Sequence, residues 1–270
     1  MKKVRLDQLL VSRGFVASRN RAYAAIVTGE VSIDGQISVK PAQLVGGDAN
    51  ILYQPANLAY VSRGGQKLEQ ALDDFGVDVK GLTILDSGVS TGGFTDCLLK
   101  KDARKIIAVD VGYGQLAWKL RCDERVELHE RVNVRHLTPQ DISELADIAT
   151  LDLSFISLKK VMPAVLGCLK EEGEVIALVK PQFEVGKGQV GKGGIVKDKS
   201  LHSEVLTSLG REFVAGNLSL IGMTWSPIVG AKGNIEYWIH LSKKPLVGYA
   251  IEGIQEAAVA VVEGAHETLK

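Results

Sequence analysis

Short apolar segments alternate with stretches of helical periodicity from residue 81 onward, and this alternation constrains the fold more than any other feature. Four of these segments read as buried strands: Thr83–Asp86, Lys105–Asp110, Ile148–Asp152 and Glu174–Lys180. Strands that alternate with helices form mostly parallel sheets with helices on both faces. Two further segments predict an antiparallel pair at the sheet edge, Leu218–Met223 and Ile235–Leu241, and residues 246–270 predict a closing helix. We therefore expect an α/β fold of the Rossmann-like type.

The beginning of the chain predicts a separate, small α+β domain. Apolar residues at helical spacing predict a first helix that ends at Gly14, and Ser18 is a suitable N-cap for a second helix. A hairpin follows, because an Asp-Gly pair between alternating apolar residues is a strong turn signal; its parts are Val31–Ile33, Asp34-Gly35, Ile37 and Val39. We expect this domain at residues 1–58, a linker at 59–64 and the α/β domain at 65–270.

The charges are distributed unevenly along the chain. Residues 1–67 carry nine Lys or Arg against four Asp or Glu, although the whole chain has no net charge. A basic segment on an otherwise slightly acidic protein is typical of a nucleic-acid contact, although scattered cations can also be an ordinary solvated surface. The candidate RNA-binding residues are Arg5, Arg13, Arg19, Arg21, Lys40 and Arg63.

Composition argues against several classes of protein. The three cysteines form no CxxC pair, which disfavours a disulfide framework or a zinc site and is typical of a reducing cytoplasm. No apolar run is long enough to span a bilayer, and no signal peptide is recognisable. We expect a cytoplasmic protein without metal or membrane contact, and the oligomeric state stays open.

A glycine-rich segment between a strand and a helix predicts a cofactor site. Asp86 ends the first strand and precedes Gly88, Gly92 and Gly93, while Asp110 ends the second strand. Ligands of open α/β sheets bind beyond the carboxyl ends of the strands, where glycines allow a close backbone approach and an acid can hold ribose hydroxyls. The spacing differs from the GxGxxG of dinucleotide sites, and an acid beside a pyrophosphate is unfavourable. The cationic, phosphate-free S-adenosylmethionine therefore fits better, with Ser90, Thr91 and Phe94 as further candidate contacts.

Four charged residues at segment ends predict a catalytic set. Asp152 and Lys180 end two predicted strands, Glu236 enters the last one, and Lys67 lies in the expected turn before the α/β domain. Methylation of a ribose hydroxyl requires removal of its proton and alignment of the oxygen. An isolated lysine titrates at about 10.4, so we expect a second cation and partial desolvation to lower the pKa of the base.

Several motifs resemble those of known families. The first 50 residues resemble the RNA-binding domain named for ribosomal protein S-four, and the cofactor and charged motifs resemble ribosomal RNA 2′-O-methyltransferases of the FtsJ/RrmJ superfamily. The whole chain resembles the TlyA family, through Ser62–Leu68, Asp86–Asp96, Glu130–Asn133, Asp152–Ser157 and Lys180–Glu184.

That resemblance implies a class I methyltransferase of ribosomal RNA, acting on the ribose of cytidine. It implies Lys180 as the base, Lys67 and Glu236 shaping it, Asp152 orienting the groups and Asn133 near the cofactor. The family also carries the label haemolysin, but no sequence feature predicts pore formation. The alternatives are a non-catalytic RNA-binding protein with a methyltransferase fold and, less favoured, a nicotinamide oxidoreductase.

Overall fold

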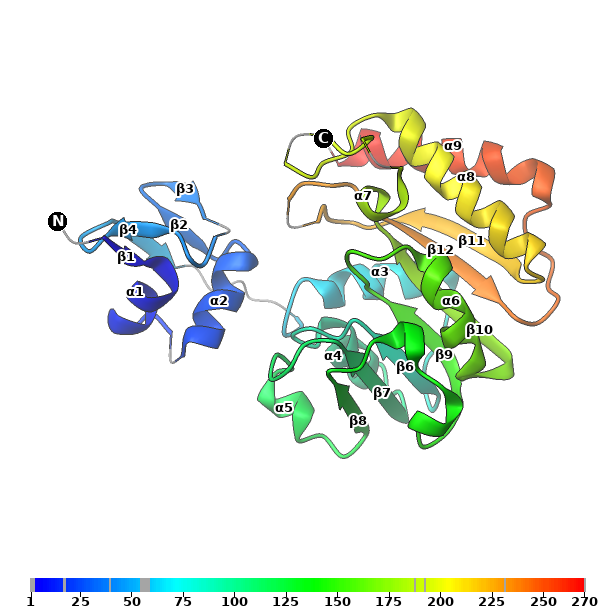
Figure 1. Ribbon diagram of the computed structural model, residues 1–270, viewed down its shortest axis with the longest axis horizontal. Coiled ribbons are helices and arrows are strands. Elements are labelled where there is room, and N and C mark those ends of the chain that lie inside the picture. The colour runs from blue at the N-terminus through cyan, green and yellow to red at the C-terminus, as the bar shows by residue number, and fades with distance from the viewer. Residues whose placement is uncertain are drawn as a thin grey trace. The chain divides into compact units, whose positions relative to one another are not determined.

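The computed structural model describes residues 3–16, 18–38, 40–53, 59–186, 188–191, 193–230 and 232–269. The chain divides into two compact units, Met1–Arg63 and Gly64–Lys270 (Figure 1). The described part of the predicted linker, residues 59–63, contains no helix or strand.

The smaller unit packs two helices against short strands. The helices are α1 (Leu6–Ser12) and α2 (Arg19–Val27), and the Ser18 hydroxyl accepts a hydrogen bond from the backbone N–H of Arg21 (3.2 Å), as expected of an N-cap. The strands form two antiparallel groups: β1 (Lys3–Arg5) with β4 (Leu44–Gly46), and β2 (Val31–Ile33) between β3 (Gln36–Ile37) and β5 (Ile51–Tyr53). The two helices and the hairpin are confirmed, except that Val39 lies outside the described residues.

The larger unit is built on a seven-stranded sheet. Its order is β11-β12-β10-β9-β6-β7-β8. The strands are β6 (Thr83–Ser87), β7 (Lys105–Asp110), β8 (Val126–Glu130), β9 (Ala146–Leu151), β10 (Leu169–Val179), β11 (Ser219–Trp225) and β12 (Tyr237–Ser242). The pairs from β10 to β8 are parallel, whereas β12 is antiparallel to both β10 and β11. The predicted, mostly parallel Rossmann-like sheet with an antiparallel pair at one edge is therefore confirmed.

Helices cover both faces of this sheet (Figure 1). The core of one face combines strand residues with α6 (Leu158–Gly167), α8 (Lys199–Ala215) and α9 (Ile254–Thr268). On the other face α3 (Gly64–Phe75) and α4 (Gly93–Lys100) contribute buried side chains, and Phe94 of α4 stacks on Trp238 of β12 at 5.6 Å between ring centroids. The short elements are α5 (Trp118–Arg121), α7 (Pro181–Glu184), η1 (Val134–His136), η2 (Pro139–Asp141) and η3 (Ile251–Gly253).

The chain changes direction between β6 and β9. It continues from β6 to β7 and β8 on one side and returns to β9 on the other, which is the switch point where such sheets bind ligands. At this point the backbone N–H of Asp152 donates to the carbonyl of Ser87 (3.0 Å). The loops after β6 and β9 consequently leave the sheet side by side.

The structure contains two strands that the sequence pattern does not predict, β5 and β8, and one predicted turn is wrong. Gly64 and Gly65 begin α3 instead of forming a turn before it, so Lys67 belongs to this helix. Gly65 and Lys67 are buried, so tertiary packing outweighs the low helix propensity of glycine.

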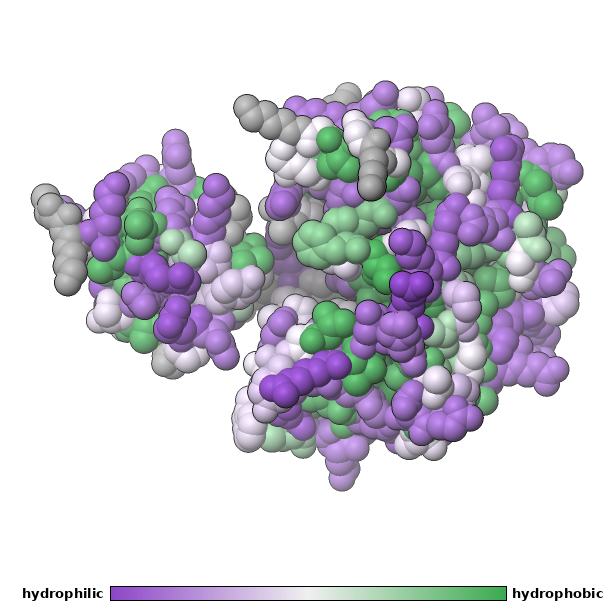
Figure 2. Space-filling model, viewed as in Figure 1, coloured by the Kyte–Doolittle hydropathy of each residue, from purple (hydrophilic) through white to green (hydrophobic). Residues whose placement is uncertain are grey.

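No helix in the described ranges has the length and apolarity needed to cross a membrane. On the face shown in Figure 2, hydrophobic residues are interspersed with hydrophilic ones.

Candidate functional site

Four charged side chains form two short ion pairs at the carboxyl edge of the sheet. Lys67 Nζ, on α3, lies 2.6 Å from a carboxylate oxygen of Glu236, just before β12. Lys180 Nζ, just after β10, lies 2.6 Å from a carboxylate oxygen of Asp152, just after β9. The Lys180 ammonium also donates to the hydroxyl of Ser154 (3.2 Å). The structure thus brings these residues together from four separate segments of the chain.

The two pairs influence each other electrostatically. Burial alone would lower the pKa of Lys180, but Asp152 and Glu236 raise it, and the net direction is upward. Burial alone would raise the pKa of Asp152, but Lys180 and Lys67 lower it below its ordinary value. The expected lowering of the lysine pKa is therefore wrong for the protein alone: the carboxylates outweigh desolvation and keep Lys180 an ammonium.

The glycine-rich loop after β6 has a left-handed backbone at Gly88 (φ 87°), Ser90 (φ 48°) and Gly92 (φ 95°). A Cβ at Gly88 would overlap the carbonyl oxygen of Asp152, and one at Gly92 would overlap the side chains of Leu116 and Leu120. These two glycines thus allow the loop to pack on the protein itself. Gly93 begins α4 and is buried, whereas Thr91 is half-buried and its carbonyl accepts from Ala117.

Asp110 lies beside this loop at the end of β7. Its two carboxylate oxygens accept hydrogen bonds from the backbone N–H of Ser90 (2.7 Å) and of Gly112 (2.6 Å). These bonds fix the carboxylate at the carboxyl edge of the sheet. Each oxygen retains a further lone pair, so the group can still accept from two hydroxyls.

Three predicted cofactor contacts are engaged within the protein. The Asp86 carboxylate is fully buried and accepts from the hydroxyls of Thr95 (2.7 Å) and Thr150 (3.1 Å). Burial raises the pKa of Asp86 to about 7, although both hydroxyls lower it. Phe94 is buried against Trp238, and the amide oxygen of Asn133 accepts from the backbone N–H of Arg135 (3.0 Å) while its residue is exposed. The Asp86 side chain is thus held by Thr95 of α4 and Thr150 of β9, and its contact with a cofactor stays a prediction.

An exposed aromatic side chain borders the ion pairs, and the sequence did not single it out. Phe155 is 88% exposed, has a left-handed backbone (φ 64°) and lies 4.9 Å from the Phe183 ring between centroids. Phe155 follows Asp152 by three residues, and Phe183 follows Lys180 by three. One sequence feature could have indicated Phe155: it follows the strand-ending residue Asp152 by only three residues. A loop segment this short does not need an aromatic residue for the core.

The predicted RNA-binding arginines of the smaller unit are held by acids and carbonyls. The buried carboxylate of Asp7 pairs with Arg5 (2.8 Å) and Arg19 (3.0 Å), and chiefly the bond from Arg5 lowers its pKa to about 2. Arg21 pairs with Glu30 (3.1 Å), and Arg13 donates to the carbonyls of Ala49 and Gly47. Lys40 is exposed and Arg63 is half-buried. Arg5, Arg19 and Arg21 therefore have fixed orientations while remaining partly exposed.

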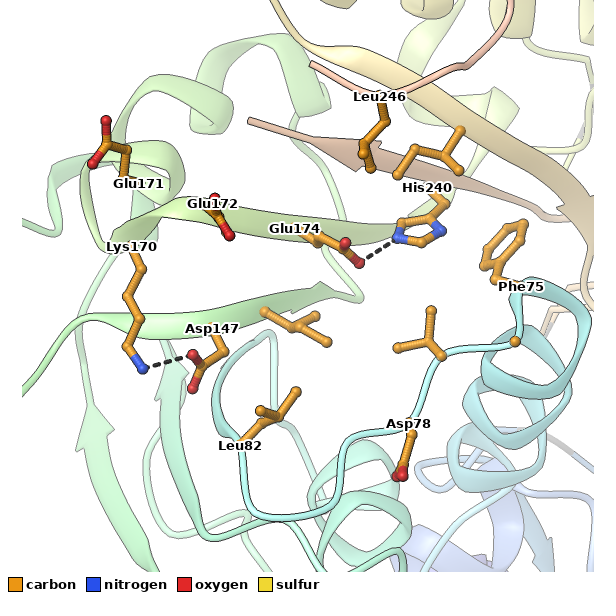
Figure 3. Close-up of a pocket in the computed structure, with 15 residues that line it drawn as sticks. Phe75, Asp78, Leu82, Asp147, Lys170, Glu171, Glu172, Glu174, His240 and Leu246 are labelled. Atoms are coloured by element: carbon orange, nitrogen blue, oxygen red, sulfur yellow. Dashed lines mark hydrogen bonds and ion pairs between the residues drawn. The ribbon is translucent and has the colours of Figure 1, made fainter. Parts of the chain in front are cut away.

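A large hollow lies at the opposite edge of the sheet. It has a volume of about 710 Å³ and is lined by residues at the amino ends of strands, among them Asp147 and Lys170, which form a 2.6 Å ion pair (Figure 3). Its size suits a ligand, but nucleotide-like ligands bind such sheets at the carboxyl edge. Within the described ranges no group of three or more His, Cys, Asp or Glu could hold a metal ion.

The sequence matches two families along its length. Residues 60–243 match the FtsJ-like methyltransferase family, and residues 4–51 match the S4 domain. A Bacillus subtilis protein with the provisional name rRNA methyltransferase YqxC is 45% identical over 270 residues, covering 100% of this chain and 96% of that protein. The 16S/23S rRNA (cytidine-2′-O)-methyltransferase TlyA of Mycobacterium tuberculosis is 43% identical, covering 97% of this chain and 99% of that protein.

A solved structure agrees with this similarity. A Streptococcus thermophilus protein provisionally named a hemolysin is 40% identical, covers 99% of this chain and 97% of its own, and superposes with a TM-score of 0.76. The likeness thus extends over both units of the chain.

Proposed function

Since this chain belongs to the TlyA family of FtsJ-like methyltransferases and includes an S4 domain, we propose that it methylates a ribose 2′-hydroxyl of ribosomal RNA. We further propose that S-adenosylmethionine is the methyl donor and that the target is a cytidine, as the name of the M. tuberculosis relative states for that protein. The observation that carries the proposal is the presence of two ion pairs, Lys180–Asp152 and Lys67–Glu236, beside the glycine-rich loop.

The residues around Asp110 fit S-adenosylmethionine. The carboxylate is fixed by two backbone N–H groups and can accept from both ribose hydroxyls of the donor. A donor without phosphates avoids the repulsion that a pyrophosphate would meet beside Asp110. When bound, this donor supplies a methyl group on a cationic sulfonium.

Lys180 is the proposed base. It must lose its proton before it can accept one from the 2′-hydroxyl, and its raised pKa opposes this loss in the protein alone. A sulfonium next to the ammonium would lower the pKa of Lys180, because like charges disfavour the charged form. Lys180 therefore becomes an effective base mainly in the presence of the donor, which limits unproductive deprotonation.

The other three charged residues orient the base. Asp152 and the Ser154 hydroxyl hold Lys180 Nζ from two directions, which restricts the position of its lone pair after deprotonation. Glu236 holds Lys67 at 2.6 Å, and Lys67 adds to the lowering of the Asp152 pKa that Lys180 chiefly causes. Such a network fixes distances between the hydroxyl, the base and the methyl group, and misplacement by about 1 Å can reduce rates by about 100-fold.

The exposed ring of Phe155 is suited to holding the target nucleotide. An aromatic side chain that is 88% exposed and backed by Phe183 offers a face on which an unpaired base can stack. We propose that the arginines fixed by Asp7 and Glu30 bind RNA phosphates, since fixed guanidinium groups lose little freedom on binding.

The test is transfer of labelled methyl groups to purified, unmodified ribosomal subunits by wild type and Lys180→Met. Lys170→Met is a matched control, because Lys170 and Asp147 form the same 2.6 Å pair between β10 and β9 at the opposite edge of the sheet. We expect label on RNA with wild type and Lys170→Met, and a loss of at least about 100-fold with Lys180→Met. Absence of label with wild type, despite binding of the donor, would reject the proposal in favour of a non-catalytic RNA-binding protein.

A further inference from the structure

A buried amide ties two loops together directly before Glu236. Asn234 is only 3% exposed, and its side chain uses both polar atoms. The amide oxygen accepts from the backbone N–H of Val196 (3.0 Å), and the amide nitrogen donates to the carbonyl of Gly194 (2.9 Å). Asn234 is thereby joined to a segment about 40 residues earlier in the sequence, and it lies two residues before Glu236 of the charged set.

A buried histidine holds the carbonyl group of the same residue, Val196. His202, on α8, is 1% exposed, and its Nε2 lies 2.9 Å from the carbonyl oxygen of Val196. A carbonyl can only accept, so Nε2 carries the proton and Nδ1 accepts from the hydroxyl of Tyr237 (2.6 Å). Burial lowers the pKa of His202, which keeps the ring neutral and this pattern of donors intact.

These contacts bracket Glu236 along the chain. Asn234 precedes it by two residues, and Tyr237 follows it. On the third side lies Gly230, where a Cβ would overlap a carboxylate oxygen of Glu236. The backbone on either side of Glu236 is thus attached to Gly194–Val196, and its carboxylate has little free space around it.

We propose that Asn234 and His202 are positioning residues, which fix the backbone around Glu236 so that its carboxylate holds Lys67 and faces Lys180. The inference rests on the proposed function, because Glu236 matters to catalysis only if the charged set acts on RNA. Neither residue reaches the reacting atoms. Both act through Val196 and through the start of β12.

The charges around Lys180 give this proposal a specific signature. The ammonium of Lys180 is surrounded by Asp152 and Glu236, which raise its pKa, and by Lys67, which pairs with Glu236. If Glu236 moves away, the pKa of Lys180 falls. The acidic limb of the rate against pH then moves to lower pH, although the rate itself decreases because Lys67 is no longer held. A general loss of stability would not produce such a shift.

The experiment measures single-turnover methylation against pH for Asn234→Ala, His202→Ala and His202→Gln. For the alanine variants we expect a rate about 10- to 100-fold lower at saturating RNA, an unchanged KM for RNA, and an acidic limb lower by about half a pH unit or more. His202→Gln should restore most of the wild-type profile, because its side-chain amide can donate to the Val196 carbonyl.

Lys243→Met is the control, since Lys243 donates to the backbone carbonyls of Leu166 and Leu169 just beyond the other end of β12. It should leave the acidic limb in place. An unshifted limb in both alanine variants, or an equal shift in Lys243→Met, would overturn the proposal.

A second readout does not depend on activity. Titration of Lys180 by NMR of ¹³C-labelled lysine should give a lower pKa in Asn234→Ala than in wild type, even if no RNA is methylated. Unchanged titration would reject the positioning role, whereas a changed titration without methyl transfer by wild type would reject the proposed function alone.

Discussion

Replacement of Asp86 by Asn should stabilise the protein at neutral pH by an amount that depends on pH. The Asp86 carboxyl is fully buried, and burial raises its pKa from 3.8 to about 7 in spite of the hydroxyls of Thr95 and Thr150. The unfolded chain therefore ionises at lower pH than the folded protein, and stability is lost as the pH rises from about 4 to about 7. At about 1.4 kcal/mol per pKa unit, the loss approaches about 4 kcal/mol above pH 7.

Urea unfolding of wild type and Asp86→Asn, repeated between pH 4.5 and 8.5, measures this difference. All three tryptophans lie in the larger unit, so their fluorescence follows the unfolding of that unit. The free energy of unfolding of Asp86→Asn relative to wild type should increase with pH and level off above pH 7. Any effect of the substitution that does not depend on pH shifts the whole curve without changing this trend. Asp152→Asn provides the contrast: the pKa of Asp152 is lowered, so the variant should be less stable across this whole pH range, and its deficit should shrink only below about pH 4. Parallel curves for wild type and Asp86→Asn would refute the reasoning.

Three further predictions concern the charged set, the donor and the RNA. Lys67→Met should lower the free energy of unfolding by about 3–5 kcal/mol, because it leaves Glu236 charged and buried without its partner. The double variant Lys67→Met with Glu236→Leu should recover much of this loss. Urea unfolding tests both variants, and equal losses in the two would contradict the prediction. Asp110→Ala should weaken binding of S-adenosylmethionine by calorimetry at least about 10-fold, since its carboxylate would otherwise accept two hydroxyls, with RNA affinity unchanged. Phe155→Ala should reduce kcat/KM for RNA by about 5- to 150-fold, the range for one stacked base, and Phe155→Tyr should retain activity; a normal rate in Phe155→Ala would exclude stacking.

The order of elements could be predicted because each central strand of the larger unit's sheet contains a short apolar run. Those strands are buried on both faces, so tertiary contacts and local pattern agree. β8 is the edge strand next to β7, is half-buried throughout and carries Glu127 and His129. Its pattern is not that of a buried strand, which explains why the sequence did not reveal it.

The charged set could be predicted as a group, but its protonation could not. Strand ends indicated that Asp152 and Lys180 meet at one edge of the sheet. The balance between desolvation and attraction depends on burial and on distances of a few ångströms, and these are tertiary properties. The direction of the Lys180 pKa was accordingly wrong.

Residues that act through packing left little trace in the sequence. Asp86 resembles a ligand contact because it precedes glycines, yet the two threonines whose hydroxyls donate to its buried carboxylate are nine and 64 residues away in the sequence. Asn234 resembles an ordinary turn residue, and its contacts with Gly194 and Val196 arise only in the folded chain. Such long-range hydrogen bonds cannot be read from local periodicity.

The most direct test of the central claim is nucleoside mass spectrometry of ribosomal RNA after reaction with wild type and Lys180→Met. Unmodified subunits would be incubated with S-adenosylmethionine, and the RNA would be digested to nucleosides. We predict new 2′-O-methylcytidine with wild type and none above background with Lys180→Met. A base-methylated nucleoside with wild type, or equal 2′-O-methylcytidine with Lys180→Met, would contradict the account.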